Sequence, residues 1–321
     1  MELLPNFIGA LMSDLILHHY PQSPFAEKMR LIFGYKKISW QSVLAPMIMP
    51  KPNLVALTGG YRRIPVLQIG ADIYCDTALI CDVLEHRQPS PTLYPEAQKG
   101  LARTVAQWAD STLFQVAMAY NFQPAGATFM FPDADKLKHF AADRAAMRNN
   151  APRMPPADAT ATYRSYLRRI SHMLEHYSWL LGDHPSVADF SVYHALWFTR
   201  HQVPPVASIL ESVPAVLAWM DRMASIGHGA STQMTAEAAL AIARDSSPMI
   251  LGDEIHQDDH GIALGSNVVI TAESFGLEPT VGRLVAATRT RYTLSREDAQ
   301  VGQVHIHFPR IGFLLKKVDP T

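Results

Sequence analysis

A serine at the start of a predicted helix is the first feature of the sequence that could do chemistry. Ser23 precedes Pro24 in the segment Ser23–Arg30, and both residue types are favoured at a helix start. The free N–H groups and the dipole at a helix N-terminus stabilise an anion, and a hydroxyl there can donate a hydrogen bond to a thiolate. Ser23 is therefore either the partner of a thiolate or an ordinary helix cap.

A proline at the start of a predicted strand is the second feature. Pro65 lies within Arg62–Leu67, and a proline in this position cannot donate to the strand ladder and often marks a turn or a cis bond. A cis bond before Pro65 would leave the N–H and C=O of Ile64 free to pair with a bound peptide. The alternative is an ordinary edge-strand proline.

A second helix start follows a hairpin signal, in the segment Asp76–Ile80. The hydroxyl of Thr77 and the N–H groups of the first helical turn could hold a carboxylate. Capping of this helix by Asp76 is the alternative interpretation.

Alternating strand and helix signals over residues 15–90 would position these three segments. Strands are predicted at residues 15–19, 38–44, 66–69 and 73–75, and helices at residues 24–37 and 77–86. The initial β-α-β order implies a parallel pair, and the hairpin at residues 70–72 implies an antiparallel one. We therefore predict an α/β domain at residues 15–90, preceded by an N-terminal extension at residues 1–14.

The rest of the chain divides into a helical block and a β-rich block. In residues 97–246, helices are predicted at residues 97–120, 159–181, 187–201, 213–226 and 235–244. In residues 247–321, strands are predicted at residues 268–271, 283–293, 303–308 and 312–318. We predict an all-helical second domain and a small additional β-rich domain of unknown role, which we interpret as a compact barrel.

The composition excludes several classes of protein. The 321 residues carry 28 Lys and Arg against 29 Asp and Glu, a net charge of −1, which argues against a nucleic-acid partner. No apolar run approaches the ~18 residues of a membrane helix, and the first basic residue is Lys28, so a secretory signal is not expected. The two cysteines, Cys75 and Cys81, are too few for a disulfide scaffold, and we expect a cytoplasmic protein.

The β-rich block contains a candidate set of metal ligands. His256–His260 packs two imidazoles and two carboxylates together, and His305 and His307 would face one side of a strand. Such a set could bind zinc or another divalent ion. A solvated acidic turn with two surface histidines is the interpretation that we favour, so no metal site is assigned.

In this order and spacing, the motifs resemble those of the cytosolic glutathione S-transferase family. Ser23–Arg30 resembles the motif between strand 1 and helix 1 of its serine-type and omega-type classes. Ile64–Leu67 is similar to the family's Val-Pro-Val-Leu, and Asp76–Ile80 to its Glu-Ser-x-x-Ile. Ser186–Phe190 is similar to the structural Ser/Thr-x-x-Asp capping box of the helical domain. The resemblance covers roughly residues 15–230.

The resemblance implies a thioredoxin-like N-terminal domain that binds glutathione and an all-helical domain that lines the site of an electrophile. It implies a transferase, in which glutathione is the co-substrate and its thiolate attacks a small apolar electrophile, and it implies a homodimer. The alternative is a non-catalytic binding or interaction protein that reuses the fold, with an appended β module. The predicted fold class is α/β plus all-α, with the small β-rich domain added at the C-terminal end.

Carried over residue by residue, the resemblance assigns roles at the glutathione thiol. Ser23 would hydrogen-bond the sulfur, and we favour it over Tyr20, which lies near where the tyrosine-type classes place their hydroxyl. Ile64 would pair its backbone with the cysteinyl unit, next to cis-Pro65. No cysteine occupies Ser23 or its neighbours, which disfavours a thiol-disulfide oxidoreductase.

The two ends of the tripeptide would meet the remaining residues. Asp76 and Thr77 would hold the γ-glutamyl end, and Lys51 or Arg63 could meet the glycyl carboxylate. Asp76 replaces the family's usual Glu, so its carboxylate reaches one methylene less far. The pair Arg62-Arg63 stands where Gly-Lys is more usual.

Overall fold

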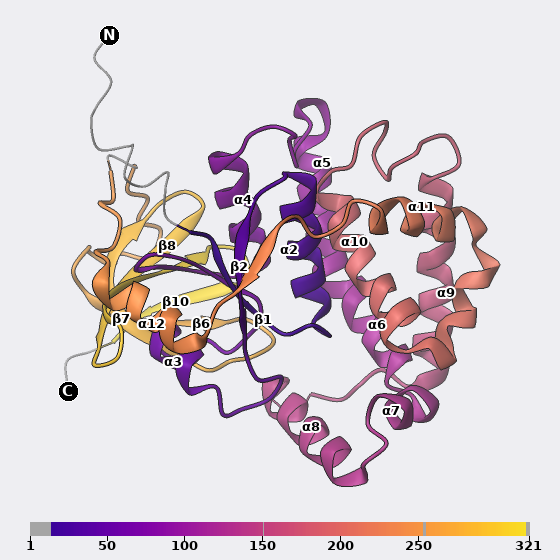
Figure 1. The fold of residues 1–321 in the computed structure, drawn as a ribbon, viewed down its shortest axis with the longest axis horizontal. Coiled ribbons are helices and arrows are strands. Elements are labelled where there is room, and N and C mark those ends of the chain that lie inside the picture. The colour runs from indigo at the N-terminus through magenta and orange to yellow at the C-terminus, as the bar shows by residue number, and fades with distance from the viewer. Residues whose placement is uncertain (1–13, 150, 253–254, 319–321) are drawn as a thin grey trace.

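A ten-stranded sheet runs through the computed structural model, which describes residues 14–149, 151–252 and 255–318 (Figure 1). The predicted extension at residues 1–14 lies, apart from Asp14, outside the described residues. The strand order across the sheet is β10-β6-β7-β8-β9-β4-β3-β1-β2-β5. The strands are β1 (Ile16–His19), β2 (Trp40–Leu44), β3 (Val66–Ile69), β4 (Asp72–Cys75), β5 (Ser231–Gln233), β6 (Asn267–Ala272), β7 (Thr280–Ala287), β8 (Arg291–Asp298), β9 (Gly302–Pro309) and β10 (Phe313–Lys317).

The first part of the chain forms the α/β unit that the strand and helix signals predict, with the thioredoxin-like arrangement that the family resemblance implies. Strand β1 pairs in parallel with β2 and antiparallel with β3, and β3 and β4 form the predicted hairpin. The helices of this unit are α2 (Pro24–Tyr35), α3 (Pro52–Thr58) and α4 (Thr77–Arg87). Helix α3 escaped prediction because seven residues are too few to show a helical period.

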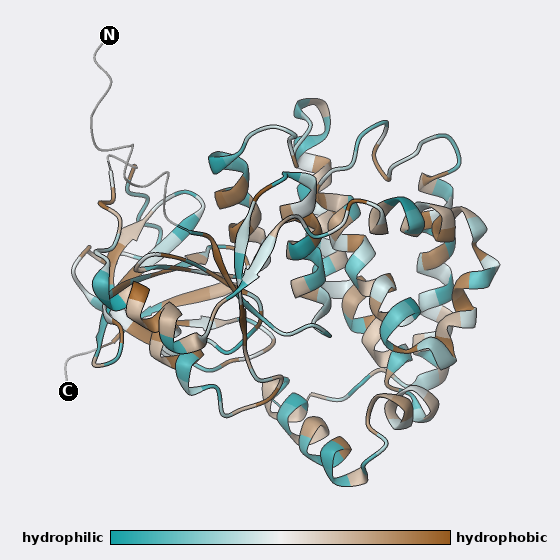
Figure 2. Cartoon of the chain, in the orientation of Figure 1, coloured by the Kyte–Doolittle hydropathy of each residue, from teal (hydrophilic) through white to brown (hydrophobic). Residues whose placement is uncertain are grey.

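Helices enclose the sheet on both faces. Helices α2 and α4 lie on the face that is turned toward the helical bundle, and α3 lies on the opposite face (Figure 1). Hydrophobic residues follow the inner strands of the sheet, and hydrophilic ones follow the outer sides of the helices (Figure 2). The sheet is therefore a buried platform, and the ends of its strands can present side chains to a site.

The second part of the chain is the predicted helical bundle. Its helices are α5 (Lys99–Trp108), α6 (Phe114–Asn121), α7 (Pro124–Met130), α8 (Ala134–Met147), α9 (Pro156–Met173), α10 (Val187–Trp197) and α11 (Pro214–Ala224). A π-helical turn, Ala109–Leu113, makes α5 and α6 continuous, as predicted for residues 97–120. Helix α9 ends earlier than predicted, and α7 and α8 were not predicted.

Helix α10 is the central helix of the bundle, and every one of its residues is buried. Ser186 and Asp189 form the predicted capping box at its start. The buried Asp189 carboxylate also accepts hydrogen bonds from the Leu180 N–H at 2.9 Å and from Trp219 Nε1 at 3.0 Å. This carboxylate therefore ties three segments of the bundle together.

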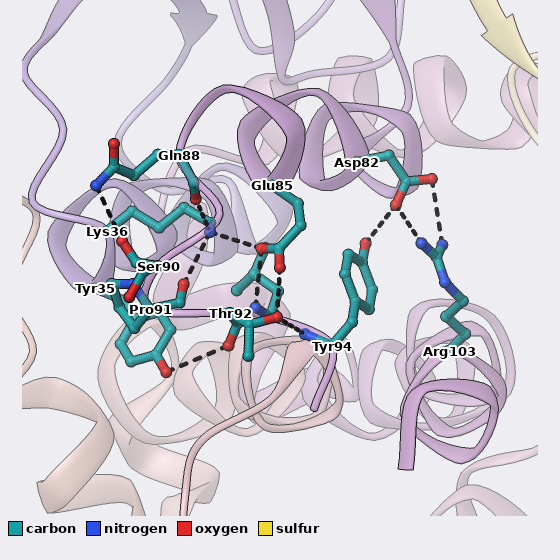
Figure 3. Close-up of polar contacts among 11 residues, drawn as sticks. Tyr35, Lys36, Asp82, Glu85, Gln88, Ser90, Pro91, Thr92, Tyr94 and Arg103 are labelled. Carbon is teal, nitrogen blue, oxygen red and sulfur yellow. Dashed lines mark hydrogen bonds and ion pairs between the residues drawn. The ribbon is translucent and has the colours of Figure 1, made fainter. Parts of the chain in front are cut away.

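A buried lysine fixes the linker between the sheet and the bundle. Lys36 Nζ donates to Glu85 Oε2 at 2.6 Å and to the carbonyl oxygens of Gln88, at 2.6 Å, and Pro91, at 2.9 Å (Figure 3). Three acceptors satisfy the three N–H groups of the ammonium, which is what a buried charge requires.

The predicted β-rich block is present, but its strands do not close into a separate barrel. Strands β6 to β10 pair antiparallel, and β9 pairs in parallel with β4, so the block continues the thioredoxin-like sheet. We call residues 255–318 the C-terminal extension. The barrel interpretation is wrong because an unpaired edge of β4 is available to β9, and no local pattern reveals such a long-range pairing.

One predicted strand of the extension is in fact a hairpin. Residues 283–293 span the end of β7, a turn and the start of β8. The Thr288 hydroxyl accepts hydrogen bonds from the N–H groups of Thr290 and Arg291 and so closes a turn that has no glycine, proline or asparagine signal.

The chain returns to the sheet between the bundle and the extension. Helix α12 (Ala236–Asp245) packs with its Ala239 against Ile16 and Val43, and the Ala239 carbonyl accepts from Gln68 Nε2 at 2.8 Å. The predicted helix at residues 235–244 is thus present, in contact with the sheet. The division of the chain at residues 15–90, 97–246 and 247–321 stays a prediction.

The extension shares one apolar core with the thioredoxin-like unit. The cluster includes Leu57 and Val66 from that unit and Leu294, Ile306 and Phe308 from the extension, all of them at most 1% exposed. Apolar burial is the main favourable term in folding, so these parts should unfold together.

We predict that Ile306→Ala lowers the free energy of unfolding by about 2–5 kcal/mol, since it opens a cavity in this shared core. Urea unfolding followed by far-UV and near-UV circular dichroism should show one common transition. Ile250→Ala, at a residue that is 85% exposed, is the matched control and should change the free energy little. A separate early transition for the extension would contradict the shared core.

Candidate active site

A cavity of about 990 Å³ lies between the thioredoxin-like unit, the helical bundle and the C-terminal extension. All eight residues that the sequence singled out as site residues line it. Side chains of α5, α6 and α8 line it from the bundle, and Phe275 and the turns around Thr290 and Ile311 line it from the extension. The structure therefore brings the three sequence motifs to one place.

Ser23 is both a helix cap and a lining residue. Its backbone is extended, and its Oγ accepts a hydrogen bond from the Ala26 N–H at 3.2 Å, which caps α2. The side chain is almost fully buried. Because capping uses only a lone pair of the oxygen, the hydroxyl proton stays available for a ligand. The two interpretations of Ser23 are thus compatible.

Tyr20 lies three residues earlier, at the rim of the same helix start. Its carbonyl accepts from the Ser23 N–H at 3.1 Å, and Lys51 Nζ lies 6.0 Å from its ring centroid. Among the described residues, its hydroxyl has no hydrogen-bond partner. Tyr20 therefore stays a second candidate for contact with a thiol.

The segment before β3 offers free backbone groups. The Ile64–Pro65 peptide bond is cis. Within the described part of the chain, neither the N–H nor the C=O of Ile64 has a hydrogen-bonded partner. A peptide that lies along this segment in an extended conformation could pair with both groups.

The start of α4 presents Asp76 and Thr77 to the cavity. Asp76 has a φ of 75°, in the left-handed region, and its carboxylate accepts from the Ala78 N–H at 2.9 Å. The nearest cation is Arg63, whose Nη1 lies 3.8 Å from Asp76 Oδ2. The Thr77 hydroxyl oxygen accepts from Lys28 Nζ at 3.2 Å. Ligand groups that reach this helix start would meet a carboxylate, a hydroxyl and free N–H groups.

Lys51 and Arg63, the two candidates for binding the glycyl carboxylate, differ in the protein groups that they already contact. Lys51 is buried, and its ammonium donates to the Arg62 carbonyl at 3.1 Å. Burial, and then the nearby Arg144 and Arg62, lower the pKa of Lys51 to about 7. Arg63 instead donates through Nε, at 2.7 Å, and through Nη2 to the carbonyl of Phe275 in the extension.

A charge cluster that the sequence did not predict lies beside the cavity, and two of its three members line it. Lys28, on α2, places its Nζ 2.6 Å from Asp110 Oδ2, and His194 Nε2 lies 3.0 Å from Asp110 Oδ1. Burial acts to raise the pKa of Asp110, but Lys28 and the hydrogen bond from His194 outweigh it and bring the pKa to about 2. Burial acts to lower the pKa of Lys28, but Asp110 raises it overall. Lys28 and Asp110 therefore stay ionised at neutral pH, whereas burial lowers the pKa of His194 and keeps its imidazole neutral.

A second unpredicted contact joins all three parts of the chain next to Lys51. The Arg62 guanidinium donates to Asp143 of α8 and, at 2.8 Å, to Glu278 of the extension. The Gly276 N–H donates to the Met147 carbonyl at 2.8 Å. The end of α8 and residues 275–278 are thus held over the segment that carries Arg62–Pro65.

The histidines of the β-rich block are placed differently from the expectation. His307 is fully buried and not at the surface: its Nε2 lies 2.8 Å from Asp72 Oδ1, and its Nδ1 lies 2.9 Å from Thr293 Oγ1. His305 lies beside it, with a ring separation of 6.2 Å, and is mostly buried. The interpretation of both as surface histidines is wrong because β9 is an inner strand of the continued sheet.

Residues His256–His260 lie in an exposed loop, where Asp259 pairs with Arg310 at 2.6 Å. Among the described residues, no three His, Cys, Asp or Glu side chains are grouped in a way that could hold a metal ion. No described helix is both long and apolar enough to cross a membrane.

We predict that Asp110→Asn reduces the dependence of stability on acid pH. The pKa of Asp110 in the folded protein is about 2, below its ordinary value of 3.8, so the carboxylate stabilises the fold above that ordinary value and loses this effect as pH falls toward 2. Between pH 5 and pH 2, wild type should lose about 2 kcal/mol more than the variant. Urea unfolding at several pH values measures this difference.

The exposed Asp135→Asn is the control for Asp110→Asn and should follow the wild-type profile. At neutral pH, Asp110→Asn should itself cost about 3 kcal/mol or more, because Lys28 loses its partner. Parallel pH profiles for wild type and Asp110→Asn would contradict the cluster.

Comparison with known proteins relates most of the chain to one family. Residues 17–92 match the family described as glutathione S-transferase, N-terminal domain, and residues 94–222 match glutathione S-transferase, C-terminal domain. A solved structure titled as a GST-like protein from Pseudomonas syringae is 42% identical, covers 96% of this chain and 100% of its own, and has a TM-score of 0.81. Because 96% coverage takes in the extension, that protein has a similar C-terminal part.

Two less similar structures share the fold only over part of the chain. A glutathione S-transferase from Rhodospirillum rubrum F11 is 21% identical over 66% of this chain and 88% of its own, with a TM-score of 0.51. A Tau class glutathione S-transferase from mango, Mangifera indica, is 13% identical over 66% of this chain and 89% of its own, also with a TM-score of 0.51. No curated protein sequence matches the chain.

Proposed function

The chain belongs to the glutathione S-transferase family, and on this premise we propose that it binds glutathione in the three-sided cavity and activates the thiol for attack on an electrophile. One observation carries the proposal. The Ser23 hydroxyl at the start of α2 and the free backbone groups of Ile64 line the same cavity. A cysteinyl residue paired with Ile64 would direct its sulfur toward Ser23.

The ends of glutathione find complementary groups on either side of Ile64. We assign the γ-glutamyl end to Asp76 and Thr77, at the start of α4. Of the two candidates for the glycyl carboxylate, we now favour Lys51 over Arg63. The amino group of Lys51 donates to one carbonyl oxygen and has further N–H groups to donate, and a bound carboxylate would favour its charged form, whereas Arg63 already gives two N–H groups to Phe275.

Activation of the thiol would come from selective stabilisation of the thiolate. A free thiol has a pKa of ~8.5, and a charge-assisted hydrogen bond of ~1.5–3 kcal/mol lowers it by one to two units. The thiolate then attacks the electrophilic carbon, a C–S bond forms, the leaving group departs with its electron pair, and the thiol proton goes to solvent. The cavity also has apolar walls, with Phe114, Met118 and Phe122 among them, which suit the carbon skeleton of the second substrate.

We retain the homodimer and the cytoplasm as proposals. Any dimer would have to form away from the edge of β4, because β9 uses the backbone groups of that edge. The two cysteines, Cys75 and Cys81, are free and buried, which fits a reducing compartment.

We predict that Ser23→Ala raises the pKa of enzyme-bound glutathione by one to two units. Near pH 6.5 this lowers kcat/KM with a chromogenic aryl halide by about ten- to a hundredfold, because the thiolate fraction falls tenfold per unit. Thiolate absorbance against pH measures the first effect and steady-state kinetics the second. The Ser23 hydroxyl is the only group removed. At a pH well below the thiol pKa, where the thiol is protonated, the affinity for glutathione should therefore change little.

Two controls belong to Ser23→Ala. Thr235→Ala removes another helix cap, at α12, and reports what the loss of a cap alone does to stability. Tyr20→Phe tests the competing hydroxyl. If Tyr20→Phe raises the thiol pKa and Ser23→Ala does not, the assignment of Ser23 is wrong. If glutathione binds and no electrophile of a broad panel reacts, the chain is a binding protein.

A further inference from the structure

The cavity has more positive charge than glutathione can use. Six of its lining cations are held by acceptors within the protein. These are Lys28, Arg62, Arg63, Arg103, Arg144 and Arg310. Four more line it without an ion-pair partner among the described residues: Lys51, Arg148, Arg153 and Arg289.

The carboxylates of the lining do not balance these four cations. Asp76 and Asp82 are paired with arginines, the latter with Arg103 at 2.7 Å (Figure 3), and Asp110 is paired with Lys28. Glu273 lies exposed at the rim. In a chain with a net charge of −1, an excess of unpaired cations around one cavity is a local feature and does not follow from composition.

Three of the four unpaired cations come from walls that glutathione does not occupy in the proposed function. Arg148 and Arg153 follow α8, and burial, then the charge of Arg153, lower the pKa of Arg148. Arg289 lies in the turn between β7 and β8 of the extension. Lys51 serves the glycyl carboxylate of glutathione, so three guanidinium groups are left over. Because these three groups line one cavity and have no ion-pair partner among the described residues, an anion bound there would meet complementary charge.

We propose that the second substrate is an organic electrophile that carries an anionic group, a carboxylate in its simplest form. This inference rests on the proposed function and names the substrate class of the same site. The apolar wall of α6 would take the carbon skeleton, and Arg148, Arg153 and Arg289 would take the anion. The C-terminal extension thus supplies part of substrate specificity through Arg289.

Two glutathione conjugates that differ in one negative charge test the proposal that the second substrate is anionic. The first is made from glutathione and 4-chloro-3,5-dinitrobenzoate, and the second from the methyl ester of that acid. In both reactions the C–S bond forms, the C–Cl bond breaks, chloride leaves and the thiol proton goes to buffer. Calorimetric titration of each conjugate into the full chain requires no turnover. Wild type should bind the carboxylate conjugate about tenfold more tightly than the ester, as expected for a charge-assisted contact of ~1.4 kcal/mol.

Arg289→Gln and Arg153→Gln should each reduce this preference to about threefold or less and leave the affinity for the ester conjugate unchanged. Arg283→Gln, at an exposed arginine on β7 outside the cavity lining, is the matched control and should keep the tenfold preference. Added salt should lower the preference in wild type, because ions screen exposed charges. Far-UV circular dichroism checks that all three variants fold.

Equal affinities of wild type for the two conjugates would overturn the inference, and so would a loss of both affinities in parallel in Arg289→Gln and Arg153→Gln. Free glutathione, titrated separately, distinguishes this failure from failure of the proposed function. If glutathione binds and the two conjugates do not differ, only the anionic second substrate is wrong. If neither glutathione nor either conjugate binds, the proposed function is wrong as well.

Discussion

The backbone pairing of β9 along β4 is the constraint on which the site depends. Edge strands have unpaired N–H and C=O groups, and a chain that leaves them open risks pairing with another molecule. Here β9 closes the edge of β4 in parallel, from Asp72 opposite His305 to Tyr74 opposite His307. The buried hydrogen bond between His307 and Asp72 joins the same two strands through their side chains. With β9 in this place, the turns of the extension reach the mouth of the cavity.

Charged contacts between the extension, α8 and the segment before β3 then hold the lining of the cavity in place. Arg62 and Arg63 follow α3 and precede β3, and each is bound by a group of the extension, Glu278 and the Phe275 carbonyl. Asp143 of α8 binds Arg62 from the other side. An arginine that is mostly buried needs such acceptors, because an unpaired charge is costly away from water. The backbone of Ile64 is therefore held between fixed neighbours, ready to pair with an extended ligand.

Much of the site could be predicted from the sequence because its motifs are local. A serine before a proline caps a helix, and Asp76 caps the next one, wherever the rest of the chain lies. The capping box of Ser186 and Asp189 follows the same logic. Short-range geometry of this kind depends on neighbouring residues alone. The family resemblance then predicted that the segments around Ser23 and Asp76 contribute to one glutathione site.

What could not be predicted is set by contacts between residues far apart in the chain. Lys28 pairs with Asp110, which lies in a π-helical turn of the helical bundle. No local sequence signal in either segment predicts this pair. Helix α8 has its apolar residues too sparsely placed for a clear period, so Asp143 had no predicted position. The extension was predicted as strands but not as a continuation of the sheet, because strand pairing between distant segments leaves no local signal.

A crystal structure of the chain with bound glutathione tests the central claim most directly. We expect the tripeptide along residues 64–65, with the cysteinyl backbone paired to Ile64, the γ-glutamyl end at the start of α4, and the sulfur within hydrogen-bonding distance of the Ser23 hydroxyl. Glutathione bound elsewhere in the cavity, or with its sulfur on Tyr20 and its backbone unpaired with Ile64, would contradict this account.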